Sequence, residues 1–148
     1  MRGVENEKNC FPLQIQALFI FGDSNVAGWR PDAPKLFGKT KTWPRRLERA
    51  LGQKWRVLVD GMPGRALENA PGSLAADLEH FSAFVSAGSP GPEDTLVLMV
   101  GVNDLPLVGS GKAVVGLANA YIERFRALAG GSEGFRGRVL YVVHPGIV

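Results

Sequence analysis

The sequence is poor in the residues that build disulfide frameworks and metal sites. Its 148 residues include a single cysteine, Cys10, and two histidines, His80 and His144. One thiol cannot close an internal disulfide, and no Cys or His cluster has the spacing of a zinc site. The glycine patterns of phosphate loops and dinucleotide folds are also incomplete, since Val114 stands where the last glycine of GxGxxG belongs. We therefore expect no metal and no organic cofactor.

Long apolar stretches are also absent. No run approaches the ~20 apolar residues that a membrane span needs. The amino-terminal segment has mixed charge, and Pro12, Gln14 and Gln16 interrupt its apolar part, unlike a secretory signal. We expect residues 1–13 to form a tail and residues 14–148 a single α/β domain. We also expect a cytoplasmic location and no membrane partner.

The sequence has little excess of either charge. Seventeen Lys and Arg residues face 14 Asp and Glu residues, for a formal net charge of +3. Most of the excess lies between positions 39 and 56, where seven cations are opposed only by Glu48. We interpret this segment as a solvated helix face and expect no nucleic-acid partner. A nucleic-acid surface, the alternative, would bind DNA with a steep salt dependence. Self-association and homo-oligomerisation are left open.

Short apolar runs alternate with helical patterns along the chain. The runs lie at residues 15–21, 56–59, 95–100 and 138–143, and the last two are nearly continuous, as in strands buried on both faces. Helical periodicity marks Trp43–Leu51, 74–85 and 112–129. The alternation predicts an α/β fold with a doubly wound parallel sheet, covered by helices and ordered 2-1-3-4.

Polar and glycine-rich segments follow all four runs. They are Gly-Asp-Ser-Asn at 22–25, Asp-Gly-Met-Pro-Gly-Arg at 60–65, Gly-Val-Asn-Asp at 101–104 and His-Pro-Gly at 144–146. In a parallel sheet they meet at the carboxyl edge of the strands. Each segment alone is also a common turn sequence. Together they supply a hydroxyl, a glycine-rich backbone and a carboxamide, which are the groups that acyl transfer requires.

These segments resemble the conserved blocks of the SGNH (GDSL-type) hydrolases. FIFGDSNVAGW is similar to the first block, GMPGR to the second and GVND to the third, in the family's order. The spacing of the first two is closest to the arylesterase and acyltransferase branch. The resemblance extends from Leu18 to the last residue. It implies a three-layer, flavodoxin-like sheet and a serine esterase that acts on carboxylic esters through an acyl-serine.

The resemblance also assigns roles to single residues. Ser24 takes the place of the nucleophile, while the backbone N–H of Gly64 and the side chain of Asn103 take those of the oxyanion donors, with the N–H of Ser24 as a third.

Asp23, Arg65 and His144 are the candidates for the substrate-binding side of the same edge. Asp23 is interpreted as fixing the first turn through backbone hydrogen bonds. Arg65 either contacts the substrate or braces the second loop, and the sequence leaves both roles open.

One block of the family is missing from its usual place. The family carries its general base and the carboxylate that orients it in an Asp-x-x-His after the fourth strand, and none follows the fourth run here. We expect a domain that is incomplete at its C-terminus and near-inactive as 148 residues. Val139, Tyr141 and Val143 would then lose part of their cover and favour self-association.

Neither histidine is expected to replace the base. His144 ends the fourth run, two interstrand spacings or ~8–10 Å from the nucleophile strand. His80 is interpreted as a surface or packing residue of a helix. The alternative function is a non-catalytic ligand-binding or assembly module on the same fold, which a serine-directed covalent probe would leave unlabelled.

Overall fold

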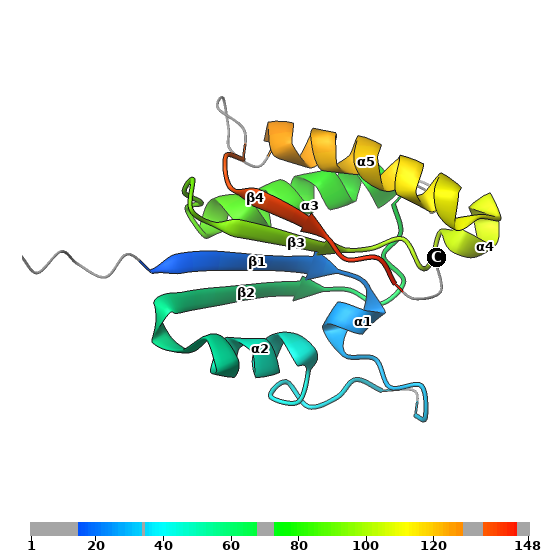
Figure 1. Cartoon of the computed structure of the whole chain (residues 1–148). Helices are drawn as coiled ribbons and strands as arrows, with labels where there is room; N and C mark the ends of the chain where they lie inside the picture. The colour runs from blue at the N-terminus through cyan, green and yellow to red at the C-terminus, as the bar shows by residue number, and fades with distance from the viewer. Residues whose placement is uncertain (1–14, 34, 68–72, 129–134, 145–148) are drawn as a thin grey trace, which may run out of the picture.

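The computed structural model describes residues 15–33, 35–67, 73–128 and 135–144 and contains a four-stranded parallel sheet (Figure 1). The strands are β1 (Gln16–Gly22), β2 (Trp55–Gly61), β3 (Thr95–Met99) and β4 (Arg138–Tyr141). Their order in the sheet is β2-β1-β3-β4, and every neighbouring pair is parallel. The predicted α/β fold class and strand order are confirmed.

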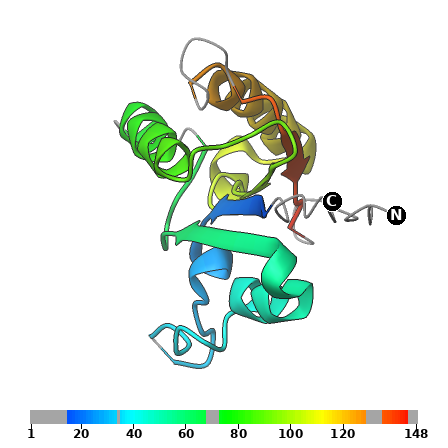
Figure 2. The same cartoon turned by 90° about the vertical axis from the view of Figure 1, so that its left-hand side faces the viewer.

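Three longer helices cover the two faces of the sheet. Helix α2 (Trp43–Leu51) lies on one face, and α3 (Ser73–Ala87) and α5 (Gly111–Leu128) lie on the other (Figure 2). All three were predicted from helical periodicity. Two four-residue helices, α1 (Ser24–Ala27) and α4 (Leu105–Val108), and the 3₁₀ turn η1 (Gly52–Lys54) were not, because they are too short to show a period.

The larger part of the core lies between the sheet and the helices α3 and α5. Since successive strand residues point to opposite faces, Phe19 and Phe21 of β1 face these helices while Leu18 and Ile20 face α2. The larger cluster also contains Leu96 and Leu98 of β3, Phe81 and Val85 of α3, and Val114, Ala118 and Tyr121 of α5. The central strand β1 is thus buried on both sides and holds its carboxyl end in a fixed place.

Strand β4 is partly covered on one face and exposed on the other. Val139 and Tyr141, which were expected to lose part of their cover, are partly buried and pack against the larger core cluster. Leu140 of β4 is 52% exposed, and Val142 and Val143, which follow the strand, are 38% and 39% exposed, as was expected for Val143. Helix α5 covers the face that carries Val139, whereas α2 lies beneath β2 and β1 and does not reach β4 (Figure 1). Self-association through this edge stays a prediction.

Within the described segments, none of the helices is long and apolar enough to cross a membrane.

The backbone of α1 lies very close to the carboxyl end of β2. Helix α1 packs over the end of β2, and a Cβ atom built at Gly61 would lie 2.3 Å from the backbone nitrogen of Ala27. Only glycine leaves room for this contact, which fixes α1 against the sheet edge.

Alanine at Gly61 should therefore destabilise the protein, by the ~1–3 kcal/mol that overpacking costs. The matched control is Gly116→Ala in α5, where a Cβ would meet nothing within 4 Å. That change should stabilise the helix by about 1 kcal/mol, because alanine has the higher helix propensity. Urea unfolding of both variants measures the two effects, and equal stabilities would contradict the packing described for α1.

Candidate active site

The first turn is built by the buried carboxylate of Asp23. Its backbone N–H donates to the carbonyl of Met99 on β3 at 3.1 Å, and its Oδ1 accepts from the backbone N–H and the side-chain Nδ2 of Asn25 at 2.8 and 3.0 Å. Asp23 is the N-cap of α1 and is 1% exposed. These contacts have the turn-fixing role that the sequence suggested, and they place Ser24 at the start of α1.

Ser24 presents two groups that the surrounding chain leaves unused. Its carbonyl accepts from the N–H groups of Gly28 and Trp29 at 2.9 and 2.8 Å, which closes the helix behind it. The residue is half-buried, and no described residue hydrogen-bonds its hydroxyl or its backbone N–H. Both groups are therefore available at the carboxyl edge of the sheet.

The second turn owes its shape to proline and glycine. The N–H of Arg65 donates to the carbonyl of Met62 at 3.2 Å, with Pro63 and Gly64 between them. Gly64 has φ = +81°, and proline followed by a residue with positive φ is the signature of a type II turn. Gly64 is exposed, and no described residue accepts its N–H. A second backbone donor is thus available next to the first turn.

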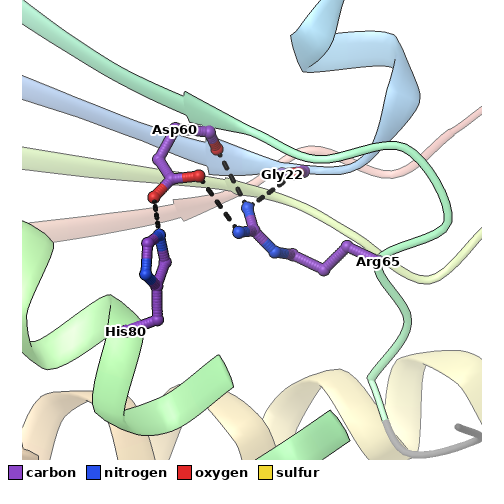
Figure 3. Close-up of polar contacts among 4 residues, drawn as sticks. All are labelled: Gly22, Asp60, Arg65 and His80. Atoms are coloured by element: carbon purple, nitrogen blue, oxygen red, sulfur yellow. Dashed lines mark hydrogen bonds and ion pairs between the residues drawn. The ribbon is translucent and has the colours of Figure 1, made fainter. Parts of the chain in front are cut away.

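The side chain of Arg65 lies under this turn and is 1% exposed (Figure 3). One guanidinium nitrogen, Nη1, donates to the carbonyls of Gly22 and Asp60 at 2.8 and 3.0 Å, and Nη2 donates to Oδ1 of Asp60 at 3.0 Å. Its carbon Cζ lies 3.8 Å from the ring centroid of Phe21. Of the two roles left open for Arg65, these contacts favour bracing the second loop.

The third turn brings a side-chain amide to the second. The N–H of Asp104 donates to the carbonyl of Gly101 at 3.1 Å, and Asn103 donates from Nδ2 to the carbonyl of Arg65 at 2.8 Å. A carboxamide nitrogen carries two hydrogens, so this bond uses one and orients the other. Asn103 is therefore held against the turn that carries Gly64.

Asp104 was not singled out from the sequence, yet it joins the same two segments. Its two carboxylate oxygens accept from the backbone N–H of Leu67 at 3.0 and 2.8 Å, and the residue is fully buried. The Gly-Val-Asn-Asp segment that pointed to Asn103 also contains Asp104. Its partner Leu67 lies 37 residues away, so the local sequence could not indicate this hydrogen bond.

Two residues near the end of β4 reach the same region. The hydroxyl of Tyr141 donates to the carbonyl of Val100 at 2.5 Å. Burial, with the charges of Asp104 and Asp23, raises the pKa of Tyr141 to about 12, so it remains a neutral donor. His144 lies close enough for its charge to bear on Asp23. Burial raises the pKa of the Asp23 carboxyl above its usual value, while the bonds from Asn25 and the charges of His144 and Arg65 oppose the rise.

Sequence reasoning missed an Asp-x-x-His that lies outside the family's usual place. Asp77-Leu78-Glu79-His80 in α3 has this spacing. The structure describes the side chain of His80, while that of Asp77 lies outside the described residues. The imidazole Nε2 lies 2.5 Å from Oδ2 of Asp60, so His80 pairs with the end of β2 (Figure 3). The spacing itself was the signal that could have singled out His80.

A hollow of about 350 Å³ lies beside α1. Its walls include Asn25, Gly28 and the indoles of Trp29 and Trp43, with Lys41 and Arg46 among the lining residues. Among the described residues, no group of three or more His, Cys, Asp or Glu side chains is placed to hold a metal ion.

Comparisons with known proteins agree with this fold. The model of the GDSL-like lipase/acylhydrolase family matches residues 20–146, and the chain belongs to this family. No curated protein matches the sequence.

Solved structures with the same fold include esterases. A carbohydrate acetylesterase from Sinorhizobium meliloti is 18% identical with a TM-score of 0.69, over 88% of this chain and 64% of that one. The native aryl esterase of M. smegmatis is 19% identical with a TM-score of 0.67, over 85% and 62%. The chain thus spans less than two-thirds of the length of these structures.

The raised pKa of Asp23 has a consequence for the pH dependence of stability. A carboxyl whose pKa is higher in the folded protein costs stability as pH rises from about 4 through the folded value. Asp23→Asn removes this titration, so the melting temperature of the variant relative to wild type should increase over that window and then level off. Thermal melts of both proteins at several pH values between about 3.5 and 7 measure this difference. A relative melting temperature that instead increases as pH falls would contradict it.

Proposed function

We propose that this chain carries the nucleophile and the oxyanion donors of a serine esterase that acts on carboxylic esters through an acyl-serine. One observation carries the proposal. The segments after β1, β2 and β3 are hydrogen-bonded to one another through Arg65 and Asn103, and they leave a serine hydroxyl and separate N–H donors unused at one edge. Membership of the acylhydrolase family and the esterase neighbours support the same reaction class.

In the proposed reaction, the hydroxyl oxygen of Ser24 attacks the ester carbonyl carbon and a C–O bond forms. The carbonyl π electrons move to oxygen, and the serine proton passes to a general base. When the tetrahedral intermediate collapses, the alcohol leaves with that proton. Water then attacks the acyl-serine by the same route and releases the carboxylic acid.

The oxyanion that forms in both steps needs donors that are already in place. The backbone N–H groups of Ser24 and Gly64 and the second amide hydrogen of Asn103 are the candidates. Donors held by the fold do not have to reorient during the reaction, so they stabilise the developing charge more than water does. The type II turn and the Asn103–Arg65 bond supply this pre-organisation.

The general base is proposed to come from outside residues 1–148. No Asp-x-x-His follows β4 in this sequence, and the chain spans 62–64% of the esterase structures compared above. His80 is engaged with Asp60, and His144 follows β4, two strands from β1. A serine hydroxyl without a base is a weak nucleophile at neutral pH.

The first test is turnover of p-nitrophenyl acetate by the wild-type chain and by Ser24→Ala, Asn103→Ala and the control Ser86→Ala, at an exposed serine of α3. We expect a faint activity that Asn103→Ala lowers. In a form extended by a C-terminal Asp-x-x-His, Asn103→Ala should lower turnover by about 10²–10³, the loss typical of one oxyanion donor, and Ser24→Ala should lower it to the faint level. Ser86→Ala should leave it unchanged. Full activity in Asn103→Ala would rule out an oxyanion role for Asn103.

The second test concerns the base. Adding a C-terminal segment that carries Asp-x-x-His should raise turnover by orders of magnitude, because removal of a triad leaves only a residual ~10³–10⁴ over water. A fluorophosphonate probe should then label Ser24 rapidly. Robust turnover of residues 1–148 that both Ser24→Ala and His144→Ala abolish would make His144 the base. Ligand binding with no labelling in either form would indicate a non-catalytic module.

A further inference from the structure

Three side chains below the second turn are joined in series (Figure 3). Asp60, at the end of β2, uses its Oδ1 to accept from Nη2 of Arg65 at 3.0 Å and its Oδ2 to contact Nε2 of His80 at 2.5 Å. Arg65 continues the series to the carbonyl of Gly22 at 2.8 Å. The series thus starts on α3, passes through the end of β2 and the end of the second turn, and reaches Gly22, which directly precedes Asp23.

Arg65 is the residue through which this series reaches the candidate oxyanion donors. Its side chain fixes the second turn to the end of β1, its backbone N–H closes the turn around Gly64, and its carbonyl receives the amide of Asn103. A displacement of Arg65 would therefore move two of the three donors relative to Ser24.

The position of Arg65 depends on Asp60 for an electrostatic reason. The guanidinium is 1% exposed, and a buried cation without a counter-charge is strongly unfavourable. The Asp60 side chain is 17% exposed and supplies that counter-charge. A carboxylate held through one oxygen keeps rotational freedom about its side-chain bonds, whereas one held through both oxygens has a defined plane. His80 supplies the second contact.

The place of His80 suits this role. Its side chain is 59% exposed, so it contributes little to the core, while its neighbour Phe81 is fully buried and fixes this part of α3 to the sheet. Its Nε2 faces Asp60 and not the first turn (Figure 3). The side chains of Asp60 and Arg65 lie between His80 and Gly22.

We propose that His80 is a positioning residue of the esterase site, which acts through Asp60 and Arg65 on the donors of Gly64 and Asn103. The proposal rests on the proposed function for its catalytic consequence, but its structural consequence can be tested independently. His80 holds the plane of the Asp60 carboxylate, the carboxylate holds the guanidinium, and the guanidinium holds the second turn.

The experiment compares wild type with His80→Ala, His80→Gln and the control Glu79→Gln. Glutamine places a side-chain N–H donor near the position of Nε2, so it should keep the bond to Asp60, whereas alanine removes it. Glu79 is the adjacent exposed residue on α3 and forms no hydrogen bond or ion pair with the described residues of the series. Thermal melts establish that all four proteins are folded.

Two readouts are measured on the full chain. In ¹H–¹⁵N spectra, the resonances of the Gly64 backbone amide and the Asn103 side-chain amide should shift in His80→Ala. In His80→Gln and Glu79→Gln they should keep their wild-type positions. In turnover of p-nitrophenyl acetate, His80→Ala should lower kcat about tenfold with KM within about twofold. This loss is smaller than the ~10²-fold that a 1 Å misplacement causes.

The outcomes separate the proposals. Unchanged Gly64 and Asn103 resonances in His80→Ala would overturn the positioning role, whatever the activity. A His80→Gln variant as inactive as Ser24→Ala would overturn it as well, because His80 would then be the general base. If the wild type shows no Ser24-dependent turnover, the proposed function fails, and the resonances alone decide whether His80 positions the turn.

Discussion

The geometry of this edge of the sheet depends on one buried ion pair, between Arg65 and Asp60. The guanidinium can remain inside the protein because a carboxylate and two carbonyls accept from it and the ring of Phe21 lies against its face. A planar guanidinium can donate from two nitrogens to the carboxylate oxygen and the two carbonyls at once, whereas a lysine would supply one point charge without this geometry. Around this pair the first turn is fixed to β1 and β3, the second to β1 and β2, and the third to the second. The hydroxyl and the N–H donors at the edge are placed by contacts that lie beneath them.

The parts that sequence reasoning predicted correctly are those that short-range physics determines. The strands appear as apolar runs, α2, α3 and α5 as helical periods, and the turns as glycine, proline and aspartate at strand ends. The role of Asp23 could be predicted because its partner is Asn25, two residues away. The second turn was located by Pro63 and Gly64, whose conformational preferences act within four residues.

The parts that were missed or left open depend on which distant residues share a face. Arg65 had two open roles because nothing in GMPGR tells whether its side chain turns toward solvent or toward Gly22 and Asp60. Asp104 was passed over because its partner, Leu67, lies in another segment, and the exposure of Leu140 depends on where the helices lie. Each of these is a question of side-chain direction in three dimensions. The Asp77–His80 spacing is different, since it was present in the sequence and overlooked.

The two halves of the proposed serine esterase site place different demands on the fold. An oxyanion site needs fixed dipoles, which backbone turns and a single carboxamide can supply once the turns are held together. The segments after β1, β2 and β3 are held together by hydrogen bonds of Arg65 and Asn103. A general base needs an imidazole at hydrogen-bond distance from the serine and a third group to orient it, and such a residue has to come from an element that reaches across the edge. His80 shows why a nearby histidine is not enough. Its Nε2 contacts Oδ2 of Asp60, and in the proposed positioning role this contact serves the donors and not the proton of Ser24. In the proposed site, the rigid donors and the proton acceptor therefore come from different parts of the protein.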